Sequence, residues 1–344
     1  MQKGLFTQGM SVLLKEPLST PELKRLLARF DFVETQSTDE EGSPEVLVFD
    51  YRPDLNAYLL VMPSSSPWPD DMGDPEGNTN DFVAWSVGQF GPLAHPGGLQ
   101  RAIDQSWGWE DGGDVVQQHQ AHVRLLIGYV NPSAPEDADD PEDWMPMIPT
   151  DYDAMGEMQF LTRAITAVLE SPKALCYFNP GGEILRDEGG LRSGLNHAWN
   201  YELPPLDMWV NVRLFHVDQD WSVMDTVGNG QLDLPDLEAV FRSDKFRHED
   251  VERFLRTASI YLLESDQDVE DGDNADGPGD LSWNALECED SLSDPPRETI
   301  RWFPEDGSEF PEAFLDRGTA EEDPMVERDD LLDDDDDSED WMIG

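Results

Sequence analysis

The chain is poor in lysine and cysteine. Its 344 residues include five Lys and two Cys against 75 Asp and Glu, and its formal net charge is −53. Lys and Arg together number only 22. These basic residues are too few to form a stripe that neutralises a phosphate backbone, which disfavours nucleic acid and anionic membrane as direct ligands. The excess of acid instead favours association with basic surfaces.

Long apolar runs are missing as well. No stretch approaches the roughly 20 apolar residues of a membrane span, and Thr7, Gln8 and Gly9 interrupt the apolar run near the N-terminus, so no secretory signal is expected. Cys176 and Cys288 stand in apolar surroundings without the spacing of a metal or redox pair, which predicts two free, buried thiols. These absences predict a cytoplasmic protein and leave its oligomeric state open.

Most of the remaining sequence is typical of a folded protein. Hydrophobic residues make up 38% and aromatic residues 10% of the chain, enough for a substantial core. Three acidic segments, residues 134–144, 264–280 and 319–344, together carry −26 of the charge, which leaves about −27 elsewhere. The last segment is predicted to be a disordered acidic tail, because the run from Asp333 to Asp337 repels itself.

Residues 1–130 predict an N-terminal α+β unit. Alternating apolar residues indicate strands at residues 10–14, 45–51, 57–62 and 122–130. Ser19 and Glu22 have the spacing of a capping box, and Leu23 and Leu26 follow at helical spacing, which predicts a helix between the first two strands.

Residues 131–310 predict a C-terminal α+β unit. A helix over residues 157–170 and a hairpin over residues 174–185 repeat the order of the first unit, which indicates two degenerate β-α-β-β units. Strands are expected at residues 208–217, 221–227, 283–288 and 299–303, with a helix that buries Val251, Phe254 and Leu255. The predicted fold class is α+β, with mixed or antiparallel sheets and amphipathic helices on one face.

Residues 63–113 form the best candidate for the wall of a pocket. Four Trp residues stand there among Gly, Pro and Asp, too many aromatics for a disordered linker, so an ordered segment is expected. The Asp residues beside the first Trp are either binding groups or, more simply, parts of a solvated loop. The candidate binding residues are Trp68, Asp70, Asp71, Asp74, Trp85, Trp107 and Trp109.

Other motifs give no chemistry. His119 and His122 lack a third zinc ligand at a suggestive spacing, so structural histidines are favoured. The acidic run from Asp266 to Asp273 departs from a calcium loop because its Gly comes one position late, so a solvated loop is favoured. The sequence therefore predicts no catalytic residue, no metal site and no cofactor.

Several short motifs occur together between residues 209 and 277. They are Asp225-Thr226-Val227-Gly228, Leu234-Pro235-Asp236-Leu237-Glu238, the helix end Ala258-Ser259-Ile260-Tyr261-Leu262-Leu263, and Asp271-Gly272-Asp273. With them the segment resembles the bacterial family catalogued as domain of unknown function 4261, and residues 9–14 and 68–73 are similar to the upstream region of longer members. The resemblance implies an α+β fold and brings no activity and no catalytic residues.

The sequence favours a non-enzymatic, acidic protein-binding module in the cytoplasm. Its partner is expected to be a protein with a basic surface, such as a toxin or a nucleic-acid-binding protein in an immunity or stress role. The alternative is a hydrolase or metal-binding enzyme that uses the Trp/Asp-rich segment, residues 68–109. Convergence of Asp70, Asp71 or Asp74 with His95 or His119 around a concave pocket would favour the enzyme, and a flat surface would favour the binding module.

Overall fold

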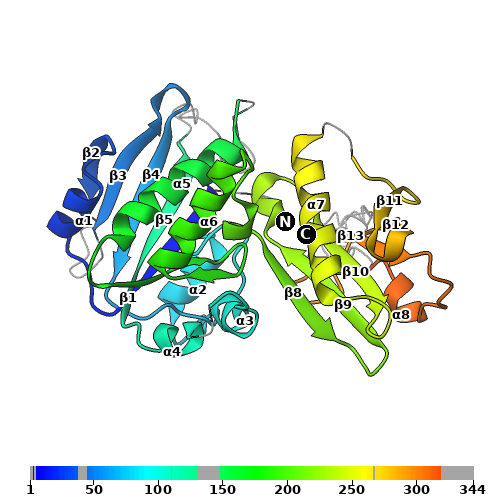
Figure 1. The fold of residues 1–344 in the computed structure, drawn as a ribbon. Helices are drawn as coiled ribbons and strands as arrows, with labels where there is room; N and C mark the ends of the chain where they lie inside the picture. Colours follow the sequence, from blue (N-terminus) through cyan, green and yellow to red (C-terminus); the bar gives the residue numbers. More distant parts are fainter. Residues whose placement is uncertain are drawn as a thin grey trace, which may run out of the picture.

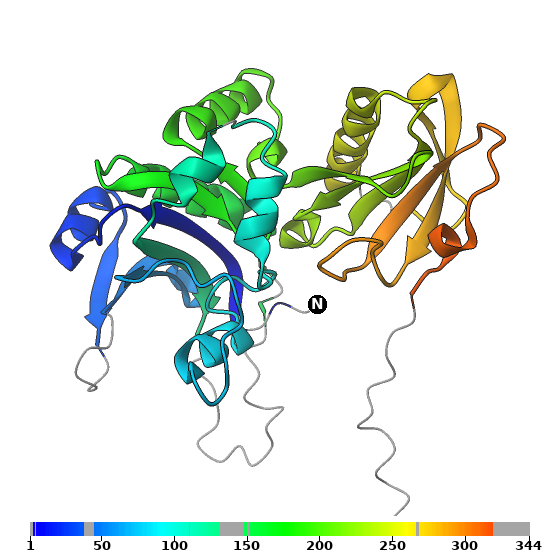
Figure 2. The same cartoon turned by 90° about the horizontal axis from the view of Figure 1, so that it is seen from below.

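The structure is a computed structural model that describes residues 3, 5–37, 45–109, 111–130, 148–149, 151–265 and 268–318. These residues form two mostly antiparallel sheets with helices packed on them, so the predicted α+β class is confirmed. Two views at right angles show the sheets as two adjoining lobes (Figures 1 and 2). The predicted tail, residues 319–344, and the acidic segment 134–144 lie outside the described residues.

The first sheet has seven strands in the order β2-β3-β4-β5-β1-β6-β7. Its strands are β1 Phe6–Leu14, β2 Phe32–Gln36, β3 Val46–Arg52, β4 Ala57–Ser64, β5 Ala121–Tyr129, β6 Ala174–Asn179 and β7 Ile184–Arg186. The central pair, β1 and β5, is antiparallel, with Met10 opposite Leu125. Every residue of these two strands is buried, because the sheet is covered on both faces.

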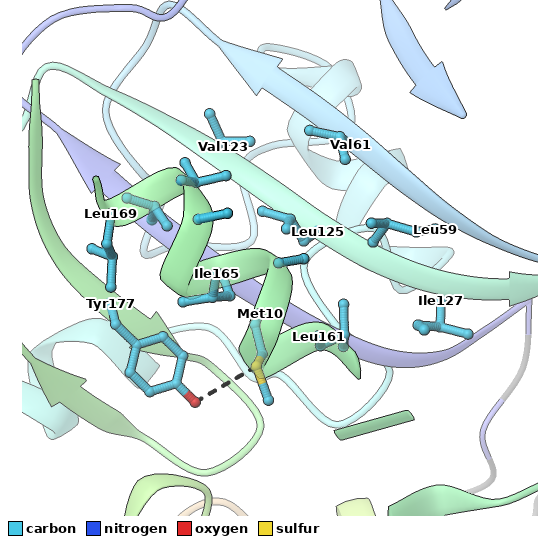
Figure 3. Packing of buried hydrophobic residues seen from close by; sticks show 14 of the residues in the cluster. Met10, Leu59, Val61, Val123, Leu125, Ile127, Leu161, Ile165, Leu169 and Tyr177 are labelled. Carbon is cyan, nitrogen blue, oxygen red and sulfur yellow. Dashed lines mark hydrogen bonds between the residues drawn. The ribbon is translucent and has the colours of Figure 1, made fainter. Parts of the chain in front are cut away.

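One face of this sheet packs against α1 (Thr20–Leu26), α5 (Ala154–Leu169) and α6 (Glu188–Asn200). Figure 3 shows Leu161 and Ile165 of α5 against Met10 of β1 and Leu125 of β5. The Tyr177 hydroxyl contacts the Met10 sulfur at 3.7 Å and donates to the Met208 carbonyl at 2.9 Å. The apolar spacing that predicted a helix over residues 157–170 thus creates the main core.

The opposite face is covered by three short helices, α2 (Thr79–Ser86), α3 (Gly98–Asp104) and α4 (Gly112–Val116). They pack with Trp68, Trp85 and Phe90 against Leu13 and Phe178 of the sheet. The prediction of helices on one face is therefore wrong for this sheet. Helices of five to eight residues are too short to show a clear apolar period, which explains the omission.

The second sheet has six strands in the order β11-β12-β13-β10-β9-β8. They are β8 Asn211–His216, β9 Trp221–Val227, β10 Asp236–Arg242, β11 Asn274–Gly277, β12 Leu281–Cys288 and β13 Thr299–Pro304. The pair β10 and β13 is parallel and the other pairs are antiparallel, so this sheet is mixed. Helix α7 (His248–Glu264) covers one face, and α8 (Glu312–Leu315) packs on the other through Phe314.

The two sheets divide the chain near Val210. Strands β6 and β7 lie in the first sheet and helix α5 packs on it. The first lobe therefore extends beyond the predicted division at residue 130. The strands of the two predicted β-α-β-β units are also arranged differently. The last strand of the first unit, β4, pairs with β5, whereas in the second unit β6, the strand that directly follows α5, pairs with β1. The proposed duplication stays a prediction.

A buried junction joins the sheets. The Trp209 side chain is fully buried and donates from Nε1 to Thr162 Oγ1 at 2.9 Å. Its carbonyl accepts from Asn179 Nδ2 and from Gln231 Nε2, each at 3.0 Å. Gly182 is required beside it, because a Cβ there would lie 1.9 Å from that carbonyl oxygen. Within the part of the chain described, no helix has the length and apolar character to cross a bilayer.

Candidate functional site

The predicted aromatic residues are divided between the core and the surface. Trp68 and Trp85 are buried in an edge-to-face contact with ring centroids 6.2 Å apart. The Trp68 backbone N–H donates to His119 Nε2 at 2.9 Å. Trp109 is partly buried against the same cluster, whereas Trp107 is 70% exposed. Two of the four rings are thus committed to packing.

The three Asp residues predicted as binding groups, Asp70, Asp71 and Asp74, accept hydrogen bonds from backbone N–H groups. The Asp70 carboxylate accepts from Leu99 N at 2.8 Å and from Gln100 N at 2.9 Å, in the first turn of α3. Asp71 accepts from Gly73 N and Asp74 from Glu76 N, each at 2.8 Å. These local bonds are typical of turns and helix caps. A binding role for the segment stays a prediction.

The predicted histidine pair also bonds to backbone. His122 is buried, its Nδ1 lies 3.0 Å from the Ser66 carbonyl, and burial together with Arg124 lowers its pKa to about 3. His119 bonds to the Val116 carbonyl and to Trp68. In the described ranges no three His, Cys, Asp or Glu side chains are grouped to hold a metal ion.

A row of buried charges crosses the second sheet. Arg213 of β8 lies opposite Asp225 of β9, Asp225 opposite Glu238 of β10, and Glu238 opposite Arg301 of β13. All four side chains are buried. Two carboxylates side by side would repel each other, but each is paired with a guanidinium on its outer side, Arg213 with Asp225 at 2.6 Å and Arg301 with Glu238 at 2.7 Å. The row is neutral as a whole.

The charge row continues into the first lobe. Arg213 Nη1 binds Glu183 Oε2 at 2.9 Å, and Arg101 Nε binds Glu183 Oε1 at 2.6 Å. Burial would raise the pKa of Asp225, but Arg213 and Arg297 outweigh this effect and hold it below its usual range. The ion pairs therefore link α3, the turn between β6 and β7, and the second sheet.

Arg297 closes the row beside the β9–β10 connection. Its guanidinium binds Asp225 Oδ2 at 2.6 Å and Asp236 Oδ2 at 3.1 Å. It also donates to the carbonyls of Thr226, Ser293 and Pro295 at 2.7 to 3.1 Å. Asp236 in turn accepts from Thr226 Oγ1 at 2.8 Å. With its donors committed in this way, Arg297 is a structural cation and not a free anion-binding group.

A cleft of about 930 Å³ lies next to these ion pairs. Gly228 and Pro235 line it from the β9–β10 connection, Leu262 from the end of α7, and Cys288 from the end of β12. His95 reaches it from the first lobe. None of the seven predicted binding residues lines the cleft.

The uncompensated charge in the cleft is negative. Asp268, Glu287 and Glu298 are exposed and form no ion pair with another described residue. The two guanidinium groups of the lining are engaged, Arg297 as above and Arg317 with Asp271. Burial and the nearby Arg101 lower the pKa of His95 to about 4, so its ring is neutral at pH 7. The cleft can therefore hold ammonium or guanidinium groups.

The thiol in this cleft is not suited to nucleophilic chemistry. Cys288 is buried, and burial raises the pKa of its thiol, which keeps it protonated at neutral pH. Cys176 is buried too, and both are free, as predicted.

Sequence reasoning missed the buried charges. Asp225 is the one charged residue of the buried strand Trp221–Val227, and Asp236 and Glu238 are buried charges in the strand Asp236–Arg242. A charge within such a strand signals a buried partner, since an unpaired charge in a core is too costly to retain. The sequence contained that signal, but the Arg residues that pair with these carboxylates lie on other strands.

Comparison with known proteins gives a match to one family model. Residues 225–303 match the family model described as Domain of unknown function (DUF4261). Twenty of the 25 residues that line the cleft fall in this segment, as do Asp225, Glu238, Arg297 and Arg301. No curated protein and no solved structure matches the chain. The resemblance to domain of unknown function 4261 that the sequence predicted is therefore confirmed for residues 225–303.

Proposed function

We propose that this protein is a non-enzymatic, cytoplasmic protein-binding module, and that its acidic cleft receives a basic segment of a partner protein. The observation that carries the proposal is the set of three exposed carboxylates, Asp268, Glu287 and Glu298, in a cleft whose guanidinium groups are already engaged. The cleft volume of about 930 Å³ is large enough for several side chains.

The charge of the whole body supports this proposal. The described residues keep 51 of the 75 Asp and Glu and 21 of the 22 Lys and Arg, a formal net charge of −30. Residues 257–296, which include the β11–β12 hairpin, contain twelve Asp and Glu and no Lys, Arg or His. Such a field raises association rates with basic surfaces. A toxin or a nucleic-acid-binding protein has the surface that this field would select.

The test compares two triple variants of the full chain with equal charge. The cleft variant carries Asp268→Asn, Glu287→Gln and Glu298→Gln. The control carries Glu16→Gln, Asp31→Asn and Asp114→Asn, three exposed acids outside the cleft that form no ion pair with a described residue. The wild-type chain first captures its partner from a lysate of its own cell at low salt, and the partner is identified by mass spectrometry and purified. The affinity of each variant for this purified partner is then measured.

We expect a basic partner whose affinity falls as sodium chloride rises. The cleft variant should weaken binding about threefold to 150-fold relative to the control, since each of the three lost exposed pairs contributes roughly 0.2–1 kcal/mol. Equal affinities for the two variants, or binding that salt does not change, would overturn the proposal.

A further inference from the structure

One buried charge of the first sheet has no counter-ion. In the described part of the chain three Arg residues are buried, Arg124, Arg213 and Arg301. Arg213 and Arg301 each hold a carboxylate, whereas Arg124 forms no ion pair with any residue that the structure describes. Burial lowers the pKa of Arg124 to about 10, so its guanidinium remains charged at neutral pH. A buried cation without an anion is costly, and Arg124 is therefore an exception that calls for an explanation.

The position of Arg124 in the sheet explains why it stays unpaired. On β5 it lies directly opposite Ser11 of β1 and Met62 of β4, neither of which carries a charge. In the second sheet, by contrast, Arg213 has Asp225 directly opposite. Strand register thus supplies the counter-ion of one buried Arg and withholds it from the other.

A turn after α2 packs on the guanidinium. Gly88 and Gly91 flank this turn with φ values of 71° and 122°, in the range that favours glycine. Between them, the Gln89 carbonyl accepts from Arg124 Nη1 at 3.2 Å, and the centre of the Phe90 ring lies 4.6 Å from the guanidinium carbon. These contacts orient the guanidinium, but they supply no negative charge.

One edge of the guanidinium remains free. Arg124 Nε is buried, and neither Nε nor Nη2 has a hydrogen-bond partner among the described residues. In Arg213 the same two atoms hold the two oxygens of Asp225, at 3.0 and 2.6 Å. This edge is the one that binds a carboxylate through two parallel hydrogen bonds. Arg124 keeps 8% of its surface exposed, so its side chain is not sealed from solvent.

Asp81 of α2 does not occupy the free edge. It acts on Arg124 through space and raises the pKa of the guanidinium, against the larger effect of burial. Its carboxylate instead accepts from Asn78 Nδ2 at 2.6 Å. The edge is thus available to an anion from outside the chain.

We propose that the Nε–Nη2 edge of Arg124 binds the carboxylate of a small organic acid. One carboxylate neutralises the guanidinium, whereas a phosphate dianion would leave a negative charge beside a body that already carries −30. Chloride offers one atom to an edge that has two donors. Arg124, Gln89 and Phe90 do not line the acidic cleft, so this inference is independent of the proposed function.

The first test follows the Arg Nε–H signals of the full chain, labelled with ¹⁵N, by NMR at slightly acidic pH. The Arg124 signal is assigned with the variant Arg124→Lys. Arg163 is the internal comparison, because it is exposed, forms no ion pair with a described residue and lies 5.5 Å from the centre of the Phe160 ring. The probes are sodium acetate, sodium phosphate and sodium chloride at equal ionic strength.

We expect acetate to shift the Arg124 Nε–H signal in a saturable way and to leave the Arg163 signal nearly unchanged. Phosphate and chloride should shift the Arg124 signal less at the same concentration. No saturable shift with acetate, or an equal shift at Arg163, overturns the inference. A larger saturable shift with phosphate overturns the assignment to a carboxylate.

A second measurement tests the same site through thermal stability. It compares the wild type with Arg124→Met, which removes the buried charge, and with Arg163→Met, which removes an exposed one. Exchange of chloride for acetate at equal ionic strength should raise the melting temperature of the wild type and of Arg163→Met by a few degrees more than that of Arg124→Met, since a ligand stabilises only the protein that binds it. General effects of acetate on the protein surface act on all three proteins and cancel in the comparison. Equal rises in the three proteins would overturn the inference.

Discussion

Arg213 and Asp225 stand directly opposite each other in the β8–β9 pair, and their side chains, both with 0% exposure, meet in a two-pronged contact at 3.0 and 2.6 Å. The geometry is that of a guanidinium and a carboxylate with parallel hydrogen bonds. Because Arg213 also binds Glu183 of the first lobe, this one contact fixes both the register of two strands and the junction of the two sheets. We expect its loss to affect the whole fold.

Removal of the Asp225 carboxylate should be strongly destabilising. Asp225→Asn leaves Arg213 and Arg297 buried with one fewer anion, and breaking a buried pair in this way costs about 3–5 kcal/mol. The control is Asp244→Asn, which breaks an exposed pair with Arg242 and should cost less than about 1 kcal/mol. Urea unfolding midpoints of the two variants give the comparison. Similar losses for both would show that the buried pair is not the stronger one.

This pair also shows how far the sequence could be interpreted. Alternating apolar residues predicted β9 as residues 221–227, and the structure has the same bounds. The helical spacing of Val251, Phe254 and Leu255 likewise predicted α7, because one long apolar stripe has few alternatives. The partner of Asp225 could not be found in this way, since Arg213 becomes its neighbour only through strand register.

The candidate site was less predictable for the same reason. Asp268, Glu287 and Glu298 come from three separate segments, and the cleft exists only after β10, β12 and β13 have paired. Trp68 and Asp70, in contrast, were singled out because they are close in sequence. The structure uses one in the core and the other at the start of a helix. Proximity along the chain was a poor guide to proximity in space.

Glu157 should make stability depend on pH. Its side chain is fully buried, Oε1 accepts from the Tyr129 hydroxyl at 2.6 Å, and burial raises its pKa to about 7. The unfolded carboxyl has a pKa of about 4.3, so between these values the folded state holds the proton more tightly. Stability from this group is therefore present at low pH and is lost as pH rises towards 7.

The variant Glu157→Gln isolates this effect. It should remove a slope of about −1.4 kcal/mol per pH unit in the free energy of unfolding between about pH 5 and pH 7. His95 and His122, whose lowered pKa values act in the opposite direction, are present in both proteins and cancel in the difference. Chemical denaturation across this range measures it. A constant difference between the two proteins would contradict the prediction.

Asp70 should matter for stability more than Asp71 and Asp74, the other two predicted Asp residues. Asp70→Ala removes the acceptor for two N–H groups in the first turn of α3 and should cost about 1 kcal/mol. Asp71→Ala and Asp74→Ala each remove one exposed turn contact and should cost less than about 0.5 kcal/mol. Thermal melting of the three variants tests the order. A larger loss for Asp71 or Asp74 would mean that these turns contribute more to the fold than their exposure indicates.

Salt should stabilise the protein. The described residues carry a formal net charge of −30, and several of their cations, among them Arg213, Arg297 and Arg301, lie within the buried row. Like charges on the surface therefore repel one another, and screening weakens this repulsion as the Debye length falls from roughly 30 Å at 0.01 M to 10 Å at 0.1 M.

The melting temperature should accordingly rise with sodium chloride, most steeply in this dilute range. The same range avoids the surface-exclusion effects of concentrated salts, which stabilise most proteins for another reason. Replacement of sodium chloride by sucrose at equal osmolality is the control and should give little change. The exposed ion pairs act in the opposite direction, because screening weakens them too, but each contributes less than about 1 kcal/mol. A melting temperature that falls with salt would mean that these pairs together outweigh the repulsion of the remaining acids.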